Sequence, residues 1–223
     1  MLSFVVHHGV ESIDDLYALA GLSVNSFQAM ILNIAEVVNG EAIFRPGDGL
    51  KSRVRVQEKI DRDYSDPLNP QGAKRVIDVL GATVLFNNRS CVEKAIPAIE
   101  RLVEKNGGQI VRFKNRFDRP ASGYRDYMLS IRLENGLVTE LLLTTKAMSK
   151  AKTFGYGHLL YEIAQKAEDV LNSSTSSEAE KQEAKKEVLL LGKLMEEYYG
   201  STGPQCDKEA FIAKWKADCL LRK

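Results

Sequence analysis

The chain has few of the residues that form disulfides or bind zinc. It contains three cysteines and three histidines in 223 residues. The cysteines, Cys91, Cys206 and Cys219, show no Cys-x-x-Cys spacing, so neither a disulfide framework nor a zinc site is expected. We interpret them as ordinary buried or surface thiols.

The chain also lacks a charge excess of either sign. It has 31 Lys and Arg against 30 Asp and Glu, a formal net charge of +1. A protein that coats nucleic acid or an acidic membrane normally carries a large basic excess. Any polyanion must therefore be met by a local cluster of cations.

Long apolar runs and a signal peptide are not evident in the sequence either. No window of about 18 apolar residues stands out, and the first residues turn acidic at Glu11 and Asp14 without a basic leader. We therefore expect no membrane partner and a location in a cytoplasm, of the producing cell or of a target cell.

Two common phosphate-binding fingerprints are missing as well. Gly49-Leu-Lys51-Ser52 resembles the end of a P-loop but lacks the GxxxxGK spacing, and no GxGxxG occurs. A nucleotide site in this chain must be built in another way.

Apolar periodicity and turn signals predict an α+β protein with a mixed sheet flanked by helices. Two helices are expected before Gly40, then a basic helix over 51–62 and a loop over 66–70. The core is predicted to follow as strand 76–86, helix 91–105 capped by Ser90, strands 109–113, 124–133 and 137–144, and helix 147–171. A helix capped by Ser177 and a final helix from 207 complete the chain. The expected division is N-terminal helices over 1–44, a core over 45–171 and a helical extension over 178–223.

Two carboxylates interrupt apolar strand patterns, Asp78 in the first predicted strand and Glu140 in the last. A buried acid is costly unless it is paired, protonated or bound to a cation. Each could pair with an arginine at a strand end. Alternatively, the two acids on neighbouring strands hold Mg²⁺, which in turn holds a nucleoside triphosphate.

Two short segments are strongly basic. The first carries Lys51, Arg55 and Lys59, spaced by four and so on one helical face, and the second carries Arg112, Lys114, Arg116 and Arg119. Such runs are often solvated faces. Opposite a carboxylate pair, however, they suit phosphoryl transfer, in which positioning and charge neutralisation do most of the work.

Aromatic and histidine side chains lie close to these segments in the sequence. Tyr124 follows Gly123 at the start of a strand, where a base could stack on its ring or where it packs under a turn. His158 and Tyr161 are one helical turn apart, and either helix packing or a role in a site accounts for them.

Taken in order, these motifs resemble the synthetase domain of RelA/SpoT-type alarmone synthetases, in a short, synthetase-only or toxin-like form. The likeness covers about residues 45–170 and rests on a series of motifs. The series comprises the basic helix Lys51, Arg55 and Lys59, the strand with Asp78, Lys114-Asn-Arg116, Gly123-Tyr124-Arg125-Asp126, Glu140 with Thr145, and His158-Leu-Leu-Tyr161-Glu.

The resemblance implies a nucleotidyltransferase-like fold and a Mg²⁺-dependent pyrophosphokinase reaction. The β,γ-diphosphate of ATP would move to a 3′-hydroxyl of a purine nucleotide, with release of AMP. It implies that Asp78 binds Mg²⁺ and that Glu140 is either a second Mg²⁺ ligand or the base that receives the proton of the 3′-hydroxyl. It also implies that Lys51, Arg55 and Lys59 bind the phosphates of ATP. For acceptor binding it implies Lys114, Arg116, Tyr124 and His158.

The chain departs from the family pattern at two places. Thr83 stands where many members have an arginine five residues after the strand aspartate, and Leu142 and Thr144 replace polar residues of an ExQxRT pattern. These departures leave the acceptor open among GDP or GTP, adenine nucleotides and the 3′ end of tRNA. A catalytically inactive nucleotide- or RNA-binding module is the alternative from another class. An antitoxin or immunity protein and a second copy of the chain are the protein partners left open.

Overall fold

The computed structural model describes residues 5–64, 72–120, 123–154 and 157–200. The chain forms two compact units. The first, here called the sheet unit, comprises Met1–Arg116 and Asp126–Thr145, and the second, the helical unit, comprises Phe117–Arg125 and Lys146–Lys223. Residues 1–44 thus belong to the sheet unit, and the helices from Lys146 onward belong to the helical unit together with Phe117–Arg125.

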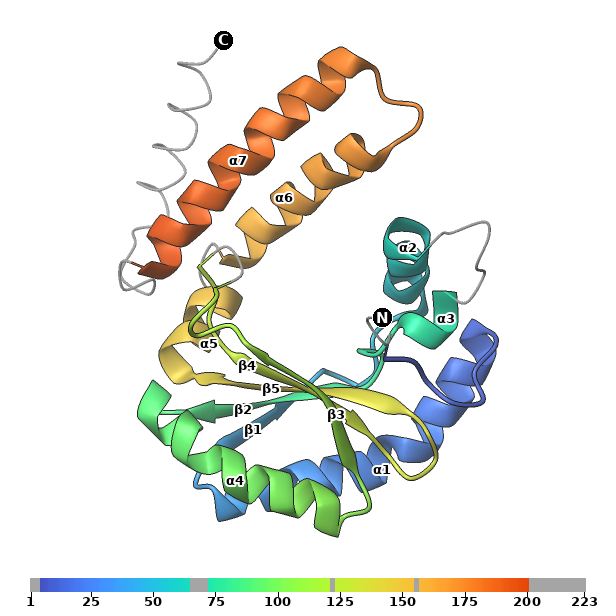
Figure 1. Cartoon of the computed structure of the whole chain (residues 1–223), viewed down its shortest axis with the longest axis vertical. Helices are drawn as coiled ribbons and strands as arrows, with labels where there is room; N and C mark the ends of the chain where they lie inside the picture. Colours follow the sequence, from blue (N-terminus) through green and yellow to red (C-terminus); the bar gives the residue numbers. More distant parts are fainter. Residues whose placement is uncertain (1–4, 65–71, 121–122, 155–156, 201–223) are drawn as a thin grey trace. The chain divides into compact units, whose positions relative to one another are not determined.

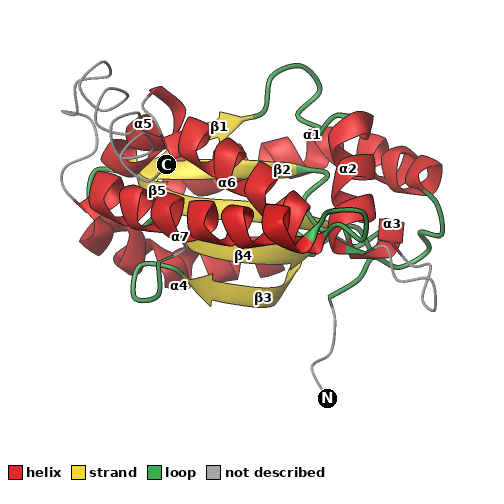
Figure 2. Ribbon diagram, turned by 90° about the horizontal axis from the view of Figure 1, so that it is seen from above, coloured by secondary structure: helices red, strands yellow, loops and turns green. Residues whose placement is uncertain are grey.

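The sheet unit is built on a five-stranded mixed sheet (Figure 1). Its strands are β1 (Glu41–Phe44), β2 (Gly81–Phe86), β3 (Gln109–Asn115), β4 (Tyr127–Arg132) and β5 (Val138–Thr145). They lie in the order β1-β2-β5-β4-β3, which Figure 2 shows from above. Among these five strands, β2 and β5 pair in parallel and the other three pairs are antiparallel. The predicted α+β class with a mixed sheet is confirmed. The short edge strand β1 was not predicted, because four residues with alternating exposure carry little apolar signal.

Helices α1 (Ile13–Val37) and α4 (Arg89–Lys105) cover one face of this sheet (Figure 1). The sheet residues that face them are fully buried and apolar, as at Leu129, Ile131, Leu141 and Leu143. This face is the core of the unit, and the opposite face carries most of the polar residues of the sheet.

The first helix corrects two expectations. The prediction of two helices before Gly40 is wrong, because α1 continues through Gly21. A glycine inside a helix costs only about 1 kcal/mol, and buried side chains on both sides of it outweigh that. α1 is also long and apolar enough to cross a membrane by length and composition, with a mean hydropathy of 1.3 over its most apolar window, contrary to the expected absence of such a run. Eight of its residues are nevertheless buried within the protein.

Local boundaries around the first acid also differ from the prediction. The strand begins only at Gly81, so Asp78 lies in a turn between the short helix α3 (Gly72–Arg75) and β2. Val76, Ile77, Val79 and Leu80 are buried in this turn, and it is their burial that gave the run a strand-like pattern. Helix α4 begins after Asn88, which caps it, rather than after Ser90.

The helical unit consists of α5 (Lys146–Phe154), α6 (Gly157–Asn172) and α7 (Glu178–Gly200), with α6 and α7 forming a hairpin (Figure 1). The single helix expected over 147–171 is therefore two. The predicted cap at Ser177 is confirmed, since its hydroxyl accepts a hydrogen bond from the Glu180 amide while the Glu180 carboxylate accepts from the Ser177 amide. The loop expected at 66–70 and the helix expected from 207 lie outside the described residues.

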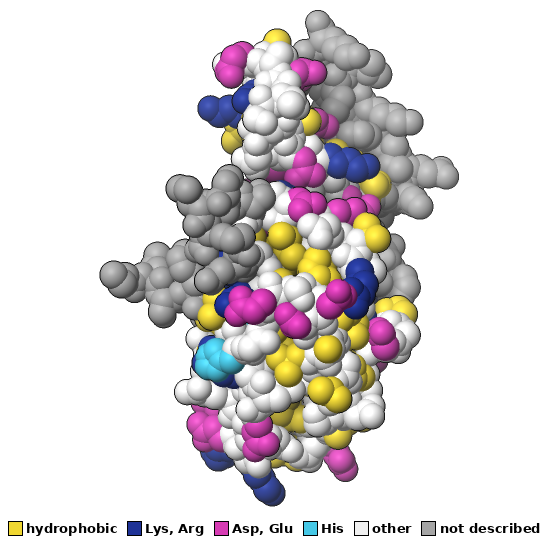
Figure 3. All heavy atoms as spheres, turned by 90° about the vertical axis from the view of Figure 1, so that its right-hand side faces the viewer, with side chains coloured by type: hydrophobic (Ala, Val, Ile, Leu, Met, Phe, Trp, Pro, Cys, Tyr) yellow, Lys and Arg dark blue, Asp and Glu magenta, His cyan; other side chains and the backbone are white. Residues whose placement is uncertain are grey.

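The surface reflects the balanced composition. On the face drawn in Figure 3, acidic and basic side chains are interspersed among hydrophobic ones, and neither sign forms a broad area there. The described residues of this face therefore show no extended anion-binding surface.

Candidate active site

The polar face of the sheet carries two rows of aligned residues in the sheet unit. Residues paired across neighbouring strands point to the same side of a sheet. The first row is Arg112, Ser130, Glu140 and Gly81, and the second is Lys114, Met128, Leu142 and Thr83. Glu140 therefore lies in the central strand β5, between Gly81 of β2 and Ser130 of β4, and the basic strand β3 lies beyond β4.

Asp78 is held between two lysines. Lys51 donates a hydrogen bond to Asp78 Oδ2, and Lys59 Nζ lies 3.1 Å from Asp78 Oδ1. All three side chains are largely buried, with 12% of Asp78 and 19% and 22% of the two lysines exposed. We refer to these three residues as the Asp78 clamp.

The clamp changes the acidity of its members. Burial opposes ionisation of Asp78, but Lys59 and Lys51 outweigh it and lower the pKa of the carboxyl below its usual range. Burial lowers the pKa of Lys51, which the charge of Asp78 only partly offsets. For Lys59 the attraction of Asp78 outweighs burial, and the pKa is raised. The ionised carboxylate of Asp78 is thus stabilised by its two lysines, and Lys59 is stabilised in its charged form in return.

The position of Lys51 differs from the prediction of one helical face. Ser52 caps helix α2 (Arg53–Asp63), so Lys51 lies just before the helix and Lys59 lies within it. The carbonyl of Lys51 accepts a hydrogen bond from the Tyr17 hydroxyl of α1, which fixes the approach of the chain to Asp78. Arg55 lies on α2 with its side chain exposed to solvent.

Glu140 contrasts with Asp78. Within the described part of the chain, its carboxylate makes neither a hydrogen bond nor an ion pair. Burial raises its pKa, and the charge of Asp78 raises it further. The cations whose charge opposes this rise are Arg45, Arg116 and Lys59. A carboxylate that is surrounded by cations and yet bound to none of them is available to a metal ion or to a proton donor.

Arg45 is a site residue that the sequence interpretation missed. Its Nη1 donates to the Val79 carbonyl at 3.1 Å, and its guanidinium occupies the space that a side chain at Gly81 would fill. A Cβ at Gly81 would lie 3.3 Å from Arg45 Nη2 and 3.1 Å from the Glu140 carbonyl oxygen. Because Gly81 and Glu140 are paired, the guanidinium lies on the face that carries the Glu140 side chain. The unpredicted strand β1 delivers it, so no motif in the sequence marked it.

The second basic segment divides into two roles. Burial lowers the pKa of Lys114, with the nearby charges of Arg112 and Arg116 contributing, while Glu140 opposes the change. Lys114 is thus part of the same electrostatic environment as Glu140. Arg116 instead forms a two-point ion pair with the fully buried Asp126, through Nε to Oδ1 at 2.5 Å and Nη2 to Oδ2 at 2.7 Å. This ion pair links the end of β3 to the start of β4, so Arg116 has a structural role in the free protein.

The remaining two predicted residues belong to the helical unit. The ring of Tyr124 packs edge to face with Tyr199 at 5.6 Å between centroids, and Lys152 Nζ lies 4.8 Å from the ring centre. His158 lies at the start of α6, and its side chain is outside the described residues. Their roles in acceptor binding stay predictions.

A Mg²⁺ ion fits the donor set of the sheet unit on chemical grounds. Asp78 Oδ1 is buried and makes no hydrogen bond despite the approach of Lys59, and the Glu140 carboxylate is unpartnered within the described residues. Mg²⁺ is usually bound by one or two protein carboxylates together with substrate phosphates and water. Among the described residues no group of three or more His, Cys, Asp or Glu side chains forms a dedicated metal cage. A metal that enters with a polyphosphate matches this arrangement.

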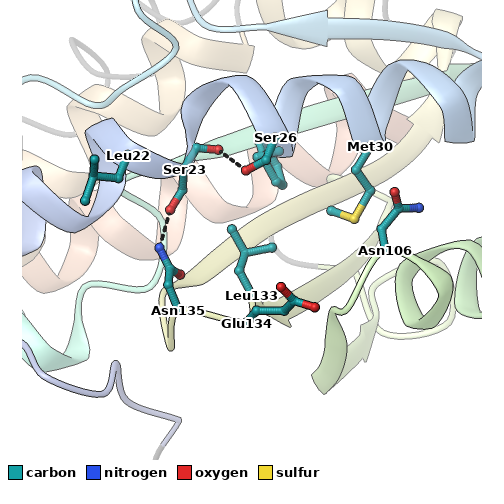
Figure 4. Close-up of a pocket in the computed structure, with 9 residues that line it drawn as sticks. Leu22, Ser23, Ser26, Met30, Asn106, Leu133, Glu134 and Asn135 are labelled. Atoms are coloured by element: carbon teal, nitrogen blue, oxygen red, sulfur yellow. Dashed lines mark hydrogen bonds between the residues drawn. The ribbon is translucent and has the colours of Figure 1, made fainter.

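A cavity of about 220 Å³ is also present in the sheet unit but is unrelated to these residues (Figure 4). It is lined by α1, by the end of α4 and by the hairpin before β5. Asn135 Nδ2 donates to the Ser23 hydroxyl across it at 2.8 Å. None of the predicted site residues lines it.

Comparison with known proteins was made at the level of sequence and of structure. No protein-family model matches the chain, and no curated protein sequence matches it. Solved structures do match. The type VI effector Tas1, solved with its immunity protein, is 15% identical with a TM-score of 0.54, covering 85% of this chain and 95% of that one.

Two further structures match to a similar degree. A GTP pyrophosphokinase family protein from Streptococcus pneumoniae is 16% identical with a TM-score of 0.53, covering 88% of this chain and 100% of that one. The small alarmone synthetase 1 from Bacillus subtilis bound to its product pppGpp is also 16% identical with a TM-score of 0.53, covering 86% and 97%. The chain therefore has the fold of small alarmone synthetases, as the resemblance of its motifs predicted.

Proposed function

We propose that the chain is a Mg²⁺-dependent pyrophosphokinase that transfers the β,γ-diphosphate of ATP to the 3′-hydroxyl of a purine nucleotide. The observation that supports this most directly is the contrast between its two acids. Asp78, in the turn before β2, is neutralised by two lysines, whereas Glu140, in the neighbouring strand β5, has no partner among the described residues. A binding module without chemistry gains nothing from a costly unpartnered carboxylate.

The lysines of the Asp78 clamp would bind the triphosphate. Their ammonium groups are preorganised close to each other, and phosphate oxygens compete with Asp78 for them. Arg45 and Lys114 lie in the electrostatic surroundings of Glu140 and would neutralise charge that spreads over the transferred group.

Glu140 would act on the acceptor. Its carboxylate is the available proton acceptor beside the cations, and the 3′-hydroxyl must lose a proton as its oxygen attacks the β-phosphorus of ATP. The bond from that phosphorus to the α,β-bridging oxygen breaks, and AMP leaves. Mg²⁺, held by Asp78 and Glu140 with phosphate oxygens, would supply charge neutralisation of the diphosphate.

The structural likenesses support the reaction class through the fold. One of them is an effector solved with an immunity protein, and one carries pppGpp as its product. We extend the proposal to growth inhibition of the cell in which the chain is active, because each turnover removes ATP and an acceptor nucleotide from the pool.

The test uses ATP labelled in its terminal phosphate, incubated with the protein, Mg²⁺ and each of GDP, GTP, ADP, AMP and tRNA. We expect the label to appear on a nucleotide together with one AMP for each product. Asp78→Asn and Glu140→Gln should each stop transfer, whereas Glu36→Gln, on the exposed face of α1, should not. Label transfer to tRNA alone would replace the nucleotide acceptor, and equal turnover in all variants would refute the assignment.

A further inference from the structure

Ser130 lies in β4 beneath the polar face of the sheet and has no hydrogen bond of its own. Its side chain is fully buried, and its hydroxyl has no partner among the described residues. Its neighbours along the strand, Leu129 and Ile131, are apolar and buried. A buried hydroxyl without a partner destabilises the folded protein, and an alanine would fit the same strand without that cost.

The hydrogen-bonding groups around Ser130 are few and defined by the strand register. Ser130 is paired with Glu140 of β5 on one side and with Arg112 of β3 on the other. Side chains of directly paired residues lie about 5 Å apart at their Cβ atoms, which a hydroxyl and a carboxylate can bridge. Arginine only donates hydrogen bonds, so Glu140 is the neighbour that can accept one from the hydroxyl.

Both groups lack a partner in the protein without substrate. The Glu140 carboxylate accepts no hydrogen bond from any described residue, and the hydroxyl of Ser130 has no hydrogen-bond partner among them. Both side chains can rotate between staggered positions, and the spacing of paired residues is short enough for the hydroxyl to reach the carboxylate. Ser130 and Glu140 are therefore a matching donor and acceptor that form no hydrogen bond in the free protein.

We propose that Ser130 is a positioning residue for Glu140 in the substrate complex. Its hydroxyl donates to one oxygen of the Glu140 carboxylate and turns the other oxygen toward the acceptor hydroxyl. This inference rests on the proposed pyrophosphokinase function and adds a residue that no motif of the sequence marks. The free protein is less stable because the Ser130 hydroxyl is unpaired, and the benefit is a geometry of Glu140 that is needed only when substrate is bound.

The matched control is Thr139, the residue before Glu140 on the opposite face of β5. Thr139 is also fully buried, but its hydroxyl donates to the Ile131 carbonyl at 3.2 Å. Thr139→Val removes a bond that exists in the free protein, whereas Ser130→Ala removes none. The two variants should therefore show opposite patterns of stability and activity.

The experiment measures thermal unfolding, kcat and KM for Ser130→Ala, Ser130→Thr and Thr139→Val. We expect Ser130→Ala to unfold at or above the wild-type temperature, with kcat lowered on the order of 10- to 100-fold, as for loss of a hydrogen bond to a charged group. KM for ATP should stay within about twofold, because Ser130 acts on Glu140 and the acceptor hydroxyl and does not contact ATP. Ser130→Thr keeps the hydroxyl and should restore most of kcat, and Thr139→Val should unfold earlier with kcat unchanged.

Two outcomes separate this inference from the proposed function. An active wild-type protein in which Ser130→Ala keeps full kcat, or in which it unfolds at a lower temperature, overturns the role of Ser130 and leaves the pyrophosphokinase assignment intact. A wild-type protein that transfers no label to any acceptor overturns both.

Discussion

Replacing each acid of the site by its amide should have opposite effects on stability. Asp78 is the centre of the Asp78 clamp, so Asp78→Asn leaves Lys51 and Lys59 charged, close together and mostly buried. Glu140 is a carboxylate without a partner among the described residues, so Glu140→Gln removes a charge that burial already disfavours. Both variants should be inactive.

The magnitudes follow from these contacts. Breaking a buried ion pair by removing one partner costs about 3–5 kcal/mol, and because an asparagine oxygen still accepts a hydrogen bond from one lysine, we expect the lower value, about 3 kcal/mol. In a chain of this size that lowers the unfolding temperature by roughly 6–12 °C. For Glu140, each unit by which burial raises the pKa corresponds to about 1.4 kcal/mol. The neutral amide is therefore expected to raise the free energy of unfolding at pH 7, opposite in sign to the effect of Asp78→Asn.

Urea unfolding followed by circular dichroism at pH 7, without nucleotide or Mg²⁺, measures both changes. Lys59→Met in the Asp78→Asn background serves as the matched control, because removing one of the two uncompensated lysines should recover part of the lost stability. Equal destabilisation by Asp78→Asn and Glu140→Gln would refute the reasoning, since it would mean that Glu140 is held by the folded protein as firmly as Asp78.

Three further predictions concern contacts outside the reacting groups. Burial lowers the pKa of His7, whose ring is hydrogen-bonded to the Val76 carbonyl and the Val138 amide. Below about pH 6.5 the unfolded chain therefore gains a proton that the folded chain does not, and the free energy of unfolding should fall by about 1.4 kcal/mol per pH unit. In urea titrations from pH 5 to 8, His7→Gln should remove this slope. Asp126→Asn should cost about 3 kcal/mol in the same assay at pH 7, because it leaves Arg116 without its buried partner. Gly123→Ala should lower the unfolding temperature of the helical unit, at a cost of about 1–3 kcal/mol, because its φ is +81° and a Cβ would lie 2.8 Å from Glu196 Cα; an unchanged melting curve would contradict it.

The sheet could be predicted from the sequence where periodicity and turn signals agree. The strands from 109 onward, the hairpin at Gly136 and the cap at Ser177 appear within a few residues of their predicted places. The prediction was wrong where burial alone shaped the pattern. The apolar run before Gly81 is a buried turn and not a strand, and Gly21 lies within a helix, because tertiary packing outweighs the local preference in both.

The candidate site shows the same division between pattern and packing. Asp78 and Glu140 could be proposed because charged residues in apolar runs need an explanation, and the two lysines because they are spaced at multiples of four in a basic segment. Arg45 and Ser130 could not, since an arginine in a loop and a serine in a strand are ordinary until the register brings them beside Glu140. What identifies Arg45 and Ser130 is their proximity to Glu140 in the folded protein, which the sequence alone does not reveal.

The balanced total charge acquires a specific meaning from this geometry. Six cations of the sheet unit interact electrostatically with the two acids or with one another: Arg45, Lys51, Lys59, Arg112, Lys114 and Arg116, of which Arg116 is also paired with Asp126. They outnumber Asp78 and Glu140, so the site is strongly positive within a chain whose net charge is +1. A local excess of this kind attracts a polyphosphate, while a near-neutral remainder does not attract longer polyanions along the rest of the surface. Raising the ionic strength should therefore weaken ATP binding only modestly, because the partly buried lysines of the Asp78 clamp are screened less than surface charges. A loss of ATP affinity as steep as that of a nucleic-acid-binding protein would place the triphosphate on exposed residues such as Arg55 instead.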